Sequence, residues 1–479
     1  MPTNIRTRSH FRACNLCEAI CGLEITVDEG DQILAIKGDS QDPLSHGHIC
    51  PKAVALKDVY ADENRLKTPV RRTTNGWEKI GWTEAFDEIA GRIKEIQSKY
   101  GADAVGTYTG NPSVHNSGTL LTRPNFLRAL KTRSNFTATS VDQLPHHFAA
   151  WAMFGHGFLL PVPDIDRTHL MLILGANPLA SNGSMMTAPG FANRLREIQK
   201  RGGKFIVIDP RKTETAKIAD EHFFIKPATD VYLLLALVNV LLDENITNAR
   251  LDLIDLSDIQ RLQELTRNFT AEKTEDLTGI SAADVRRLAV DLSTSKTAVV
   301  YGRIGVSIQK FGTLCQWLIN VLNILTGNFD RAGGAMFTAP AFDILQKAKK
   351  GANVFNRWQT QVRGLPEFDG ELPVAALAEE IEAENIKGFF TIAGNPVLST
   401  PNGKQLEKAF EKLDFYVAVD IYLNETTRFA DIILPPTTGL EVAHYDIAFH
   451  QLAVRNTARI SVPLFEKTAE QRHDWEIFE

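Results

Sequence analysis

Four of the chain's five cysteines lie within the first 50 of its 479 residues. Their spacing is C-x2-C-x3-C-x28-C with a proline after the last one, and they are Cys14, Cys17, Cys21 and Cys50. Four thiolates can hold one tetrahedral zinc ion or one [4Fe–4S] cluster. Structural zinc sites usually offer two close pairs of ligands, whereas here one loop supplies three cysteines. The spacing therefore favours the cluster, with zinc as the alternative.

Other interpretations of the cysteines are weaker. A radical-initiating cluster would use three cysteines in the order C-x3-C-x2-C, which is the reverse of the order in this chain. Five cysteines are also too few for a disulfide framework in a chain of this length. The fifth, Cys315, lies in the apolar run TLCQWLINVLNIL and is expected to be a small buried side chain.

Two distant segments repeat the same series of features. LMLILGANP (170–178) and GFFTIAGNP (388–396) each read as a strand that ends in a turn with Gly, Asn and Pro. In both copies a helical pattern follows, then a strand that ends in an acid, Asp209 or Asp420, and then Ala-Asp, an apolar run and Pro. Four ordered features in two copies predict a duplicated α/β half-domain.

Such turns are suited to nucleotide binding. They place backbone N–H groups and an Asn amide at the carboxyl edge of a parallel sheet, where phosphates and sugars bind. The acid after the next strand can accept a hydrogen bond from a ribose or a base. Each motif alone is also an ordinary turn or strand end. Two equivalent copies favour a ligand with two nucleotide-like arms.

The surrounding patterns indicate the elements that position these residues. The first 65 residues contain short alternating runs such as LEITVDEG and ILAIKGDS, which predict a small β-rich module. Further on, amphipathic helices alternate with short apolar strands, which predicts α/β domains with mostly parallel sheets. The first long helix is expected to have Thr83 as its N-cap and to end at Gly101.

Composition excludes some classes of function. The net charge of −6 comes without a basic stripe, so no nucleic-acid partner is expected. The strongly apolar run from Val231 to Leu242 is too short to span a bilayer and predicts a buried helix, so no membrane segment is expected. No apolar leader precedes Cys14, which predicts a cytoplasmic location.

The segment CNLCEAICGLEITVDEGDQILAIKGDSQDPLSHGHICPKAVAL resembles the iron–sulfur module of the molybdopterin oxidoreductases, the dimethyl sulfoxide reductase superfamily, which includes formate dehydrogenases and nitrate reductases. Further family-like motifs follow in order: GANP, VIDPRKTETAKIAD, KPATD, YGRIGVSIQKFG, ILTGNFDRAGG, IAGNP and ETTRFADIILPPTTGLE. The resemblance covers essentially the whole chain. It implies a [4Fe–4S] module at 1–65, a first α/β dinucleotide-binding domain at 66–137 and 340–440, a second at 138–339, and a return segment at 441–479.

The resemblance implies an oxidoreductase that holds molybdenum or tungsten between the dithiolenes of two molybdopterin guanine dinucleotides. The metal would exchange two electrons, often with an oxygen atom, with a small substrate, while the cluster passes single electrons to an electron-transfer protein or subunit. Lys52 matches the family lysine between cluster and pterin; the alternative is a surface lysine. By matching motif, the dinucleotide-binding residues would be Asn177, Asp209, Arg211, Thr229 and Asp230 for one dinucleotide, and Gly394, Asn395 and Asp420 for the other. The family's P-G-T-D is P-A-T-D here, with Ala228 in place of glycine.

The segment expected to supply the metal's protein ligand departs from the family pattern. Many members have cysteine or selenocysteine where this chain has Asp142. A hard carboxylate suits a high-valent, oxo-bearing metal, which favours oxygen-atom chemistry over formate oxidation. Ser140, or no side chain at all, is the alternative. His146 and His147 follow, and His146 is a candidate for positioning substrate or moving protons, or else a packing residue.

A second departure concerns the end of the sequence. It stops at RHDWEIFE, which reads as the start of a helix, whereas the family continues into a C-terminal cap domain. We expect that cap to be truncated or to come from another chain. The alternative to an enzyme is a non-catalytic iron–sulfur electron-transfer or scaffold subunit with the same fold, as in the related large subunit of respiratory complex I.

Overall fold

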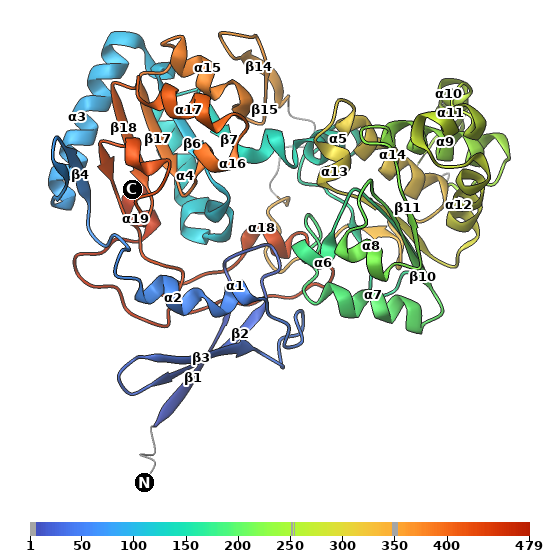
Figure 1. Cartoon of the computed structure of the whole chain (residues 1–479), viewed down its shortest axis with the longest axis horizontal. Helices are drawn as coiled ribbons and strands as arrows, with labels where there is room; N and C mark the ends of the chain where they lie inside the picture. The colour runs from blue at the N-terminus through green and yellow to red at the C-terminus, as the bar shows by residue number, and fades with distance from the viewer. Residues whose placement is uncertain (1–5, 251, 253, 347–352) are drawn as a thin grey trace. The chain divides into compact units, whose positions relative to one another are not determined.

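The computed structural model describes residues 6–250, 252, 254–346 and 353–479 (Figure 1). The chain divides into two compact units. Unit 1 consists of residues 1–141, 353–448 and 458–479, and unit 2 consists of residues 142–352 and 449–457. Each unit contains one copy of the repeated segment.

Unit 1 begins with a small antiparallel sheet. Its strands are β1 (Thr7–Ala13), β2 (Gly22–Asp28) and β3 (Ile33–Gly38), in that order. Alternate residues of β2, namely Leu23, Ile25 and Val27, are fully buried. Two short helices follow, α1 (Pro51–Val54) and α2 (Leu56–Ala61). This confirms the predicted β-rich module.

The rest of unit 1 is built on a mainly parallel sheet with the strand order β16-β7-β6-β17-β18-β19-β4-β5. Only the pairings of β4 with β19 and β5 are antiparallel among the described residues. The strands are β4 (Val70–Thr73), β5 (Gly76–Lys79), β6 (Val105–Thr109), β7 (Asn135–Thr137), β16 (Leu372–Pro373), β17 (Gly388–Ile392), β18 (Phe415–Val419) and β19 (Ile432–Ile433).

Helices cover both faces of this sheet, as Figure 1 shows. Successive residues of β17 therefore enter different cores: Phe389 packs in one apolar cluster and Phe390 in another. The main helices are α3 (Trp82–Tyr100), α4 (Ser117–Leu130), α15 (Leu377–Glu382) and α17 (Gly403–Phe410). A hairpin of β14 (Phe355–Gln359) and β15 (Pro366–Phe368) lies outside the sheet order.

Unit 2 contains a parallel sheet with the order β11-β10-β9-β12. Its strands are β9 (Leu170–Leu174), β10 (Lys204–Ile208), β11 (Glu221–Phe223) and β12 (Ala298–Gly302). The larger helices are α5 (Leu144–Phe154), α7 (Phe191–Lys200), α9 (Asp230–Asp243), α10 (Leu256–Thr266), α11 (Ala271–Thr278), α12 (Ala282–Thr294) and α14 (Gly312–Leu325). Together the two sheets confirm the predicted α/β class.

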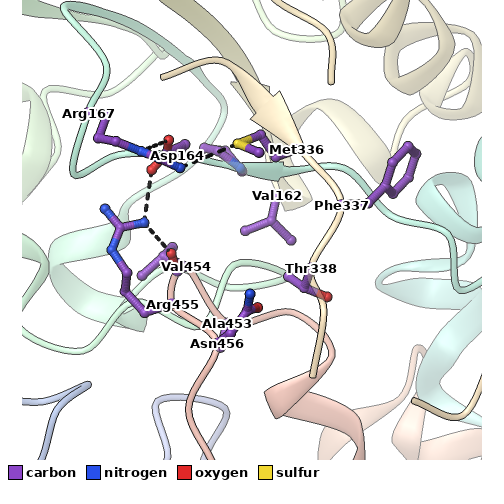
Figure 2. A pocket seen from close by; sticks show the side chains of 11 residues that line it. Val162, Asp164, Arg167, Met336, Phe337, Thr338, Ala453, Val454, Arg455 and Asn456 are labelled. Atoms are coloured by element: carbon purple, nitrogen blue, oxygen red, sulfur yellow. Dashed lines mark hydrogen bonds and ion pairs between the residues drawn. The ribbon is translucent and has the colours of Figure 1, made fainter. Parts of the chain in front are cut away.

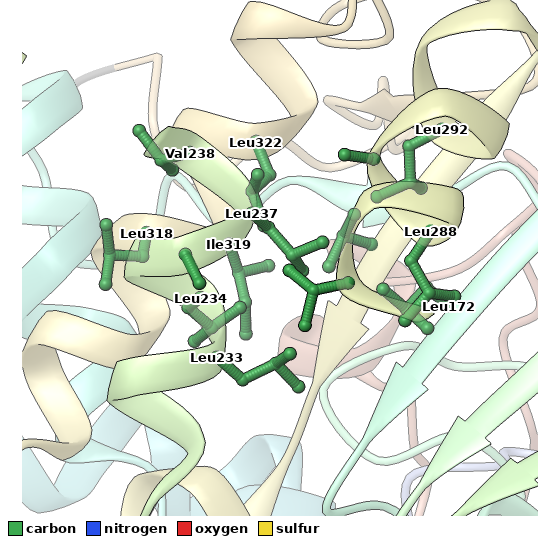
Figure 3. Packing of buried hydrophobic residues seen from close by; sticks show 14 of the residues in the cluster. Leu172, Leu233, Leu234, Leu237, Val238, Leu288, Leu292, Leu318, Ile319 and Leu322 are labelled. Atoms are coloured by element: carbon green, nitrogen blue, oxygen red, sulfur yellow. The ribbon is translucent and has the colours of Figure 1, made fainter. Parts of the chain in front are cut away.

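The core of unit 2 forms where α9, α12 and α14 pack together against the sheet (Figure 3). Leu237 of α9 lies among Leu288 of α12 and Leu322 of α14 in this view, and all three are buried. Cys315 is fully buried in the same cluster, as expected. The apolar run 231–242 is the buried helix α9, and no helix in the described ranges has the length and apolarity needed to cross a bilayer.

The ends of α3 test the predicted helix boundaries. Gly101 ends the helix with a left-handed φ of 91° and donates its N–H to the Gln97 carbonyl, as predicted. The predicted N-cap was wrong: Gly81 is the N-cap, and Thr83 lies inside the first turn. The extended backbone of Gly81, with ψ of 155°, lets its carbonyl accept from Ala85 N–H, so the helix begins before the threonine.

Candidate cofactor sites

The first three cysteines lie on a loop that is closed at its base. Cys14 follows β1 and Cys21 precedes β2, and the Cys14 N–H donates to the Cys21 carbonyl at 2.8 Å. Between them the chain turns back at Ile20, which has a left-handed φ of 40° and donates to the Cys17 carbonyl at 3.2 Å. The pairing of β1 with β2 thus fixes where this loop begins and ends.

Cys50 comes from a later segment, as the N-cap of α1. Burial raises the pKa of Cys21, and the other three thiols raise it further. Burial likewise raises the pKa of Cys14 to about 12. The four cysteines are therefore near one another, Cys14 and Cys21 buried and Cys17 and Cys50 half-buried, which fits a cofactor that takes one thiolate on each of four irons.

Within the described ranges, no group of three or more His, Cys, Asp or Glu side chains is placed to hold a metal ion. Lys52 is an exposed residue of α1, and its charge lowers the pKa of Cys17 against the raising effect of burial. The lysine is thus close to the thiols at the solvent side.

In unit 2 the repeated turn is held by Asn177. This residue follows β9 and is the N-cap of α6 (Pro178–Ser181). Its Nδ2–H donates to Glu214 Oε2 at 2.7 Å, and its Oδ1 accepts from Thr215 Oγ1 at 2.8 Å. The Thr215 hydroxyl in turn accepts from the Leu179 N–H at 3.2 Å. The amide therefore organises the turn.

In unit 1 the second turn has the same network. Asn395 follows β17 and is the N-cap of α16 (Pro396–Ser399). Its Nδ2–H donates to Glu425 Oε2 at 2.8 Å, its Oδ1 accepts from Thr426 Oγ1 at 2.6 Å, and Val397 N–H donates to the same hydroxyl at 3.2 Å. The Glu-Thr pair is a fifth shared feature that the sequence comparison missed, although the letters E-T stand in both copies.

Asp209 follows β10 and Asp420 follows β18, and these two acids make equivalent hydrogen bonds. Asp209 Oδ1 accepts from the N–H two residues later, at 2.8 Å, and Asp420 Oδ1 does so at 3.0 Å. The Ala-Asp pairs correspond too: Asp220 Oδ2 accepts from the second residue of β10, and Asp431 Oδ2 from the second residue of β18, both at 2.8 Å. Strand, turn, helix, acid and Ala-Asp therefore recur in both units, as the sequence predicted.

Gly394 and its neighbours explain why small residues are needed at the carboxyl edge in unit 1. A Cβ at Gly394 would lie 2.7 Å from Tyr108 Cε1 and 2.9 Å from Gly110 Cα. Gly110 begins a third Gly-Asn-Pro turn, residues 110–112, directly after β6. The sequence comparison missed this turn because no matching strand, acid and Ala-Asp series follows it.

The remaining predicted dinucleotide residues lie in unit 2. Arg211 is largely exposed, with Nη2 3.6 Å from Glu214 Oε2. Thr229 donates its hydroxyl to the Lys226 carbonyl at 2.6 Å. Asp230 begins α9 and accepts from Gln309 Nε2 at 3.0 Å; burial raises its pKa, and the nearby Asp209 raises it further. Asp209 and Asp230 therefore lie close enough to interact electrostatically.

The turn before Thr229 has an unusual backbone. Ala228 has a left-handed φ of 65°. This is the position where the family's P-G-T-D motif has glycine, so the structure keeps the glycine conformation although the side chain has changed.

Asp142 is paired with an arginine that the sequence did not single out. Arg303 follows β12, is buried, and donates from Nη2 to Asp142 Oδ1 at 2.7 Å. Arg303 also donates from Nε to Ser184 Oγ at 2.5 Å. The pair uses Oδ1 of Asp142, so Oδ2 is the atom that a metal-ligand role would need.

His146 and His147 lie on the first turn of α5 and bond to backbone carbonyls. His146 Nε2 is 3.0 Å from the Gly302 carbonyl, and His147 Nδ1 is 2.8 Å from the Gly157 carbonyl. Burial, with the charge of Arg303 as a smaller cause, lowers the pKa of His146 to about 3. His146 lines a small cavity of about 40 Å³ with residues that include Tyr301. Its Nδ1 is 3.4 Å from Ser307 Oγ, so both ring nitrogens have a polar neighbour.

A larger pocket of unit 2, of about 320 Å³, is shown in Figure 2. Its charged groups bond to one another: Asp164 accepts from Arg167 Nε at 2.5 Å and from Arg455 Nη1 at 2.9 Å, and also from Gly333 N–H at 2.7 Å. Residues predicted to bind cofactors do not line it. We assign it no part in the cofactor sites.

Comparison with known proteins bears on these sites. A family model described as molybdopterin oxidoreductase matches residues 65–479, and one described as molybdopterin oxidoreductase Fe4S4 domain matches residues 12–61. The chain belongs to the molybdopterin oxidoreductase family. This confirms the resemblance seen in the sequence, and it supports a molybdopterin and a 4Fe–4S cluster as the family's cofactors.

Two curated relatives of this molybdopterin oxidoreductase are similar over most of the chain. The assimilatory nitrate reductase catalytic subunit of Bacillus subtilis is 25% identical, and the match covers 98% of this chain and 67% of the relative. Formate dehydrogenase H of Escherichia coli is 28% identical over 89% of this chain and 62% of the relative. The chain thus spans between three fifths and about two thirds of these relatives.

A solved structure shows the same fold. Acetylene hydratase from Pelobacter acetylenicus superposes with a TM-score of 0.82 at 21% identity, covering 98% of this chain and 68% of that one. At this identity the likeness concerns the fold alone.

Proposed function

We propose that this chain forms the cofactor-binding part of a molybdenum or tungsten oxidoreductase that holds two molybdopterin guanine dinucleotides and one [4Fe–4S] cluster. The observation that carries the proposal is the pair of matching turns, one in each unit, each with an Asn–Glu–Thr network at the carboxyl edge of a parallel sheet. When bound, the metal would exchange two electrons, often with an oxygen atom, with a small substrate, and the cluster would pass single electrons.

The turns and acids would hold the dinucleotides. The turns before α6 and α16 stand at the carboxyl edges of their sheets, where phosphates bind, and the fixed acids Asp209 and Asp420 can accept from ribose hydroxyls or guanine N–H groups. Arg211 is exposed and can pair with a phosphate in place of its 3.6 Å contact with Glu214. Thr229 and Asp230 shape the turn beside Asp209.

The cysteine module would serve electron transfer. Cys14, Cys17, Cys21 and Cys50 would bind the cluster as thiolates, which a metal stabilises in spite of burial. Lys52 places a cation next to Cys17 and would stabilise added negative charge there. The outlet for single electrons would be a separate protein or subunit, and the cytoplasm is the proposed location.

Asp142 is the proposed protein ligand of the metal. Arg303 would hold Oδ1 of the carboxylate, leaving Oδ2 for the metal. His146, with its pKa lowered to about 3, is neutral at physiological pH and would position neighbouring groups as a hydrogen-bond partner. This weakens the prediction that His146 moves protons.

Metal and nucleotide analysis of the purified protein tests the proposal. We expect about four irons per chain, molybdenum or tungsten, and GMP released by acid hydrolysis at two per metal. Iron without molybdenum, tungsten or GMP would instead support the non-catalytic electron-transfer or scaffold subunit. Zinc in place of iron would overturn the cluster.

The ligand role of Asp142 has its own test. Asp142→Ala should change the Mo(V) paramagnetic resonance spectrum and abolish turnover, because a ligand is lost. Arg303→Lys keeps a cation beside the carboxylate and serves as the matched control, with a smaller spectral change. A Mo(V) spectrum of Asp142→Ala that is identical to that of the unmodified protein would reject Asp142 as ligand.

A further inference from the structure

Arg12 is a charged side chain in the interior of the cysteine module. It lies near the end of β1, opposite Leu23 of β2, and has 0% of its surface exposed. Leu23 belongs to the apolar core of the module, which also contains Cys14 and Cys21. The guanidinium is therefore buried on the face of the sheet that packs toward the cysteines.

The hydrogen bonds of Arg12 are incomplete. Its Nε donates to the Ala13 carbonyl at 3.4 Å, while Nη1 and Nη2 are buried and have no acceptor among the described residues. Two other inward arginines of unit 1 have acidic partners: Arg65 pairs with Glu441 at 3.2 Å, and Arg459 with Asp39 at 2.7 Å. A buried cation without an acceptor is costly, so an anion is expected beside Arg12.

Cys14, a proposed cluster ligand, lies two residues after Arg12 and is buried in the same module. The Cys14 N–H donates to the Cys21 carbonyl and so continues the pairing of β1 with β2, which places the side chains of Arg12 and Cys14 on the same face. The guanidinium is thus within electrostatic reach of a proposed cluster ligand. A cluster bound by four thiolates is negatively charged, and its sulfur atoms accept hydrogen bonds.

We propose that Arg12 donates its unpartnered Nη–H groups to the sulfur atoms of the cluster or its thiolates and thereby raises the cluster's reduction potential. Reduction adds one negative charge to the cluster. A fixed cation in a dry environment stabilises that added charge strongly, whereas the charge of exposed Lys52 is screened by water. Arg12 is therefore a positioning and tuning residue for electron transfer, and this role rests on the proposed cluster.

Redox titration of the cluster, followed by paramagnetic resonance, tests this role. Arg12→Met removes the charge and suits the apolar surroundings, so the holoprotein is expected to fold. At a fixed ambient potential the ratio of reduced to oxidised cluster should fall at least tenfold, which is about 59 mV for one electron. Arg8→Gln is the control, because Arg8 lies on the same strand but is exposed and paired with Asp31; its ratio should not change.

Two further variants separate charge from packing. Arg12→Lys keeps the cation and should stay near the unmodified potential, while Arg12→Gln keeps donors without the charge and should be lowered. If Arg12→Met does not take up iron, the comparison of Arg12→Lys with Arg12→Gln tests the proposal. Equal reduction potentials of the cluster in these two variants would overturn it. An unchanged potential in loaded Arg12→Met would overturn it as well. Absence of the cubane signal from the unmodified protein would contradict the proposed function instead.

Discussion

The two copies of the repeated segment share a hydrogen-bond network but differ in how crowded and how dry they are. In both, an Asn amide joins a Glu carboxylate to a Thr hydroxyl across the turn. The residue that leaves the strand is Gly175 in unit 2 and Ala393 in unit 1, with similar left-handed φ values of 53° and 49°. The backbone conformation is thus kept while the side chain is not.

The reason lies in what faces each turn. A Cβ at Gly175 would lie 2.8 Å from the Val306 nitrogen and 2.9 Å from the Gly305 carbonyl carbon, both backbone atoms that cannot move aside. Ala393 carries its Cβ at the same backbone angle. Both copies thus require the left-handed turn. Glycine itself is required only in unit 2, where the loop with Gly305 and Val306 packs against the turn.

The largest expected effect is that of Gly175→Ala. Left-handed strain and overpacking against Gly305 together should lower the free energy of unfolding by about 3 kcal/mol. Gly202→Ala is the matched control, since Gly202 has a left-handed φ of 80° but open space around it, and should lose about 1 kcal/mol. Urea unfolding measures both. Equal losses would show that crowding at Gly175 has no cost.

The acids of the two copies give the next test, through pH. Burial raises the pKa of Asp420 to about 6, so the native protein binds more protons than the unfolded chain between about pH 4 and 6. The contribution of Asp420 to the stability of the cofactor-free protein should therefore be fully present below this window and be lost as pH rises through it, by up to about 3 kcal/mol. Asp420→Asn should remove this contribution.

Two other acids define the controls. Asp474, whose pKa burial also raises to about 6, remains in Asp420→Asn and should keep a residual slope. In Asp209→Asn, the equivalent change in the other copy, Asp420 is still present and the fall should persist. Unfolding free energies measured across the window check this. A slope in Asp420→Asn as steep as in the unmodified protein would contradict the desolvation of Asp420.

The amides should have equal effects in both copies. Asn177→Ala and Asn395→Ala each leave a buried Thr hydroxyl without its acceptor, which should cost about 1–2 kcal/mol of unfolding free energy. Each should also lower the GMP content of the purified protein by one of its two equivalents, if each turn holds one dinucleotide. Asn193→Ala, which removes an exposed amide inside α7 bonded to Arg196, is the control. Loss of GMP from one variant alone would show that the copies are not equivalent in binding.

The sequence predicted the parts of these sites that depend on local pattern. Apolar strands, Gly-Asn-Pro turns and strand-ending acids are short signals, and their repetition made them reliable. Arg303 and Asp142 are separated by 161 residues, and nothing in either segment indicates their ion pair. Arg12 was missed because an inward arginine differs from an outward one only in the register of β1 with β2. Contacts set by tertiary packing were thus beyond pattern reasoning.

The smallest expected effect is that of Ala393→Gly, and its sign is opposite to that of Gly175→Ala. Glycine relieves a left-handed strain of about 1–2 kcal/mol at φ 49°. It also raises the conformational entropy of the unfolded chain, which lowers the free energy of unfolding by about 0.5–1 kcal/mol. A net gain of up to about 1 kcal/mol in unfolding free energy is therefore expected. Ala228→Gly, at φ 65°, should behave alike.

Ala409→Gly, in the buried face of α17, is the contrasting control and should lose about 1 kcal/mol because its backbone is helical. Thermal and urea unfolding of the three variants decide the matter. A loss in Ala393→Gly would mean that the alanine methyl gains more from its surroundings than its backbone loses. In that case the surroundings of the turn in unit 1 would have adapted to the methyl group of Ala393. The alternative is that the uncrowded turn only tolerates the left-handed strain of this alanine.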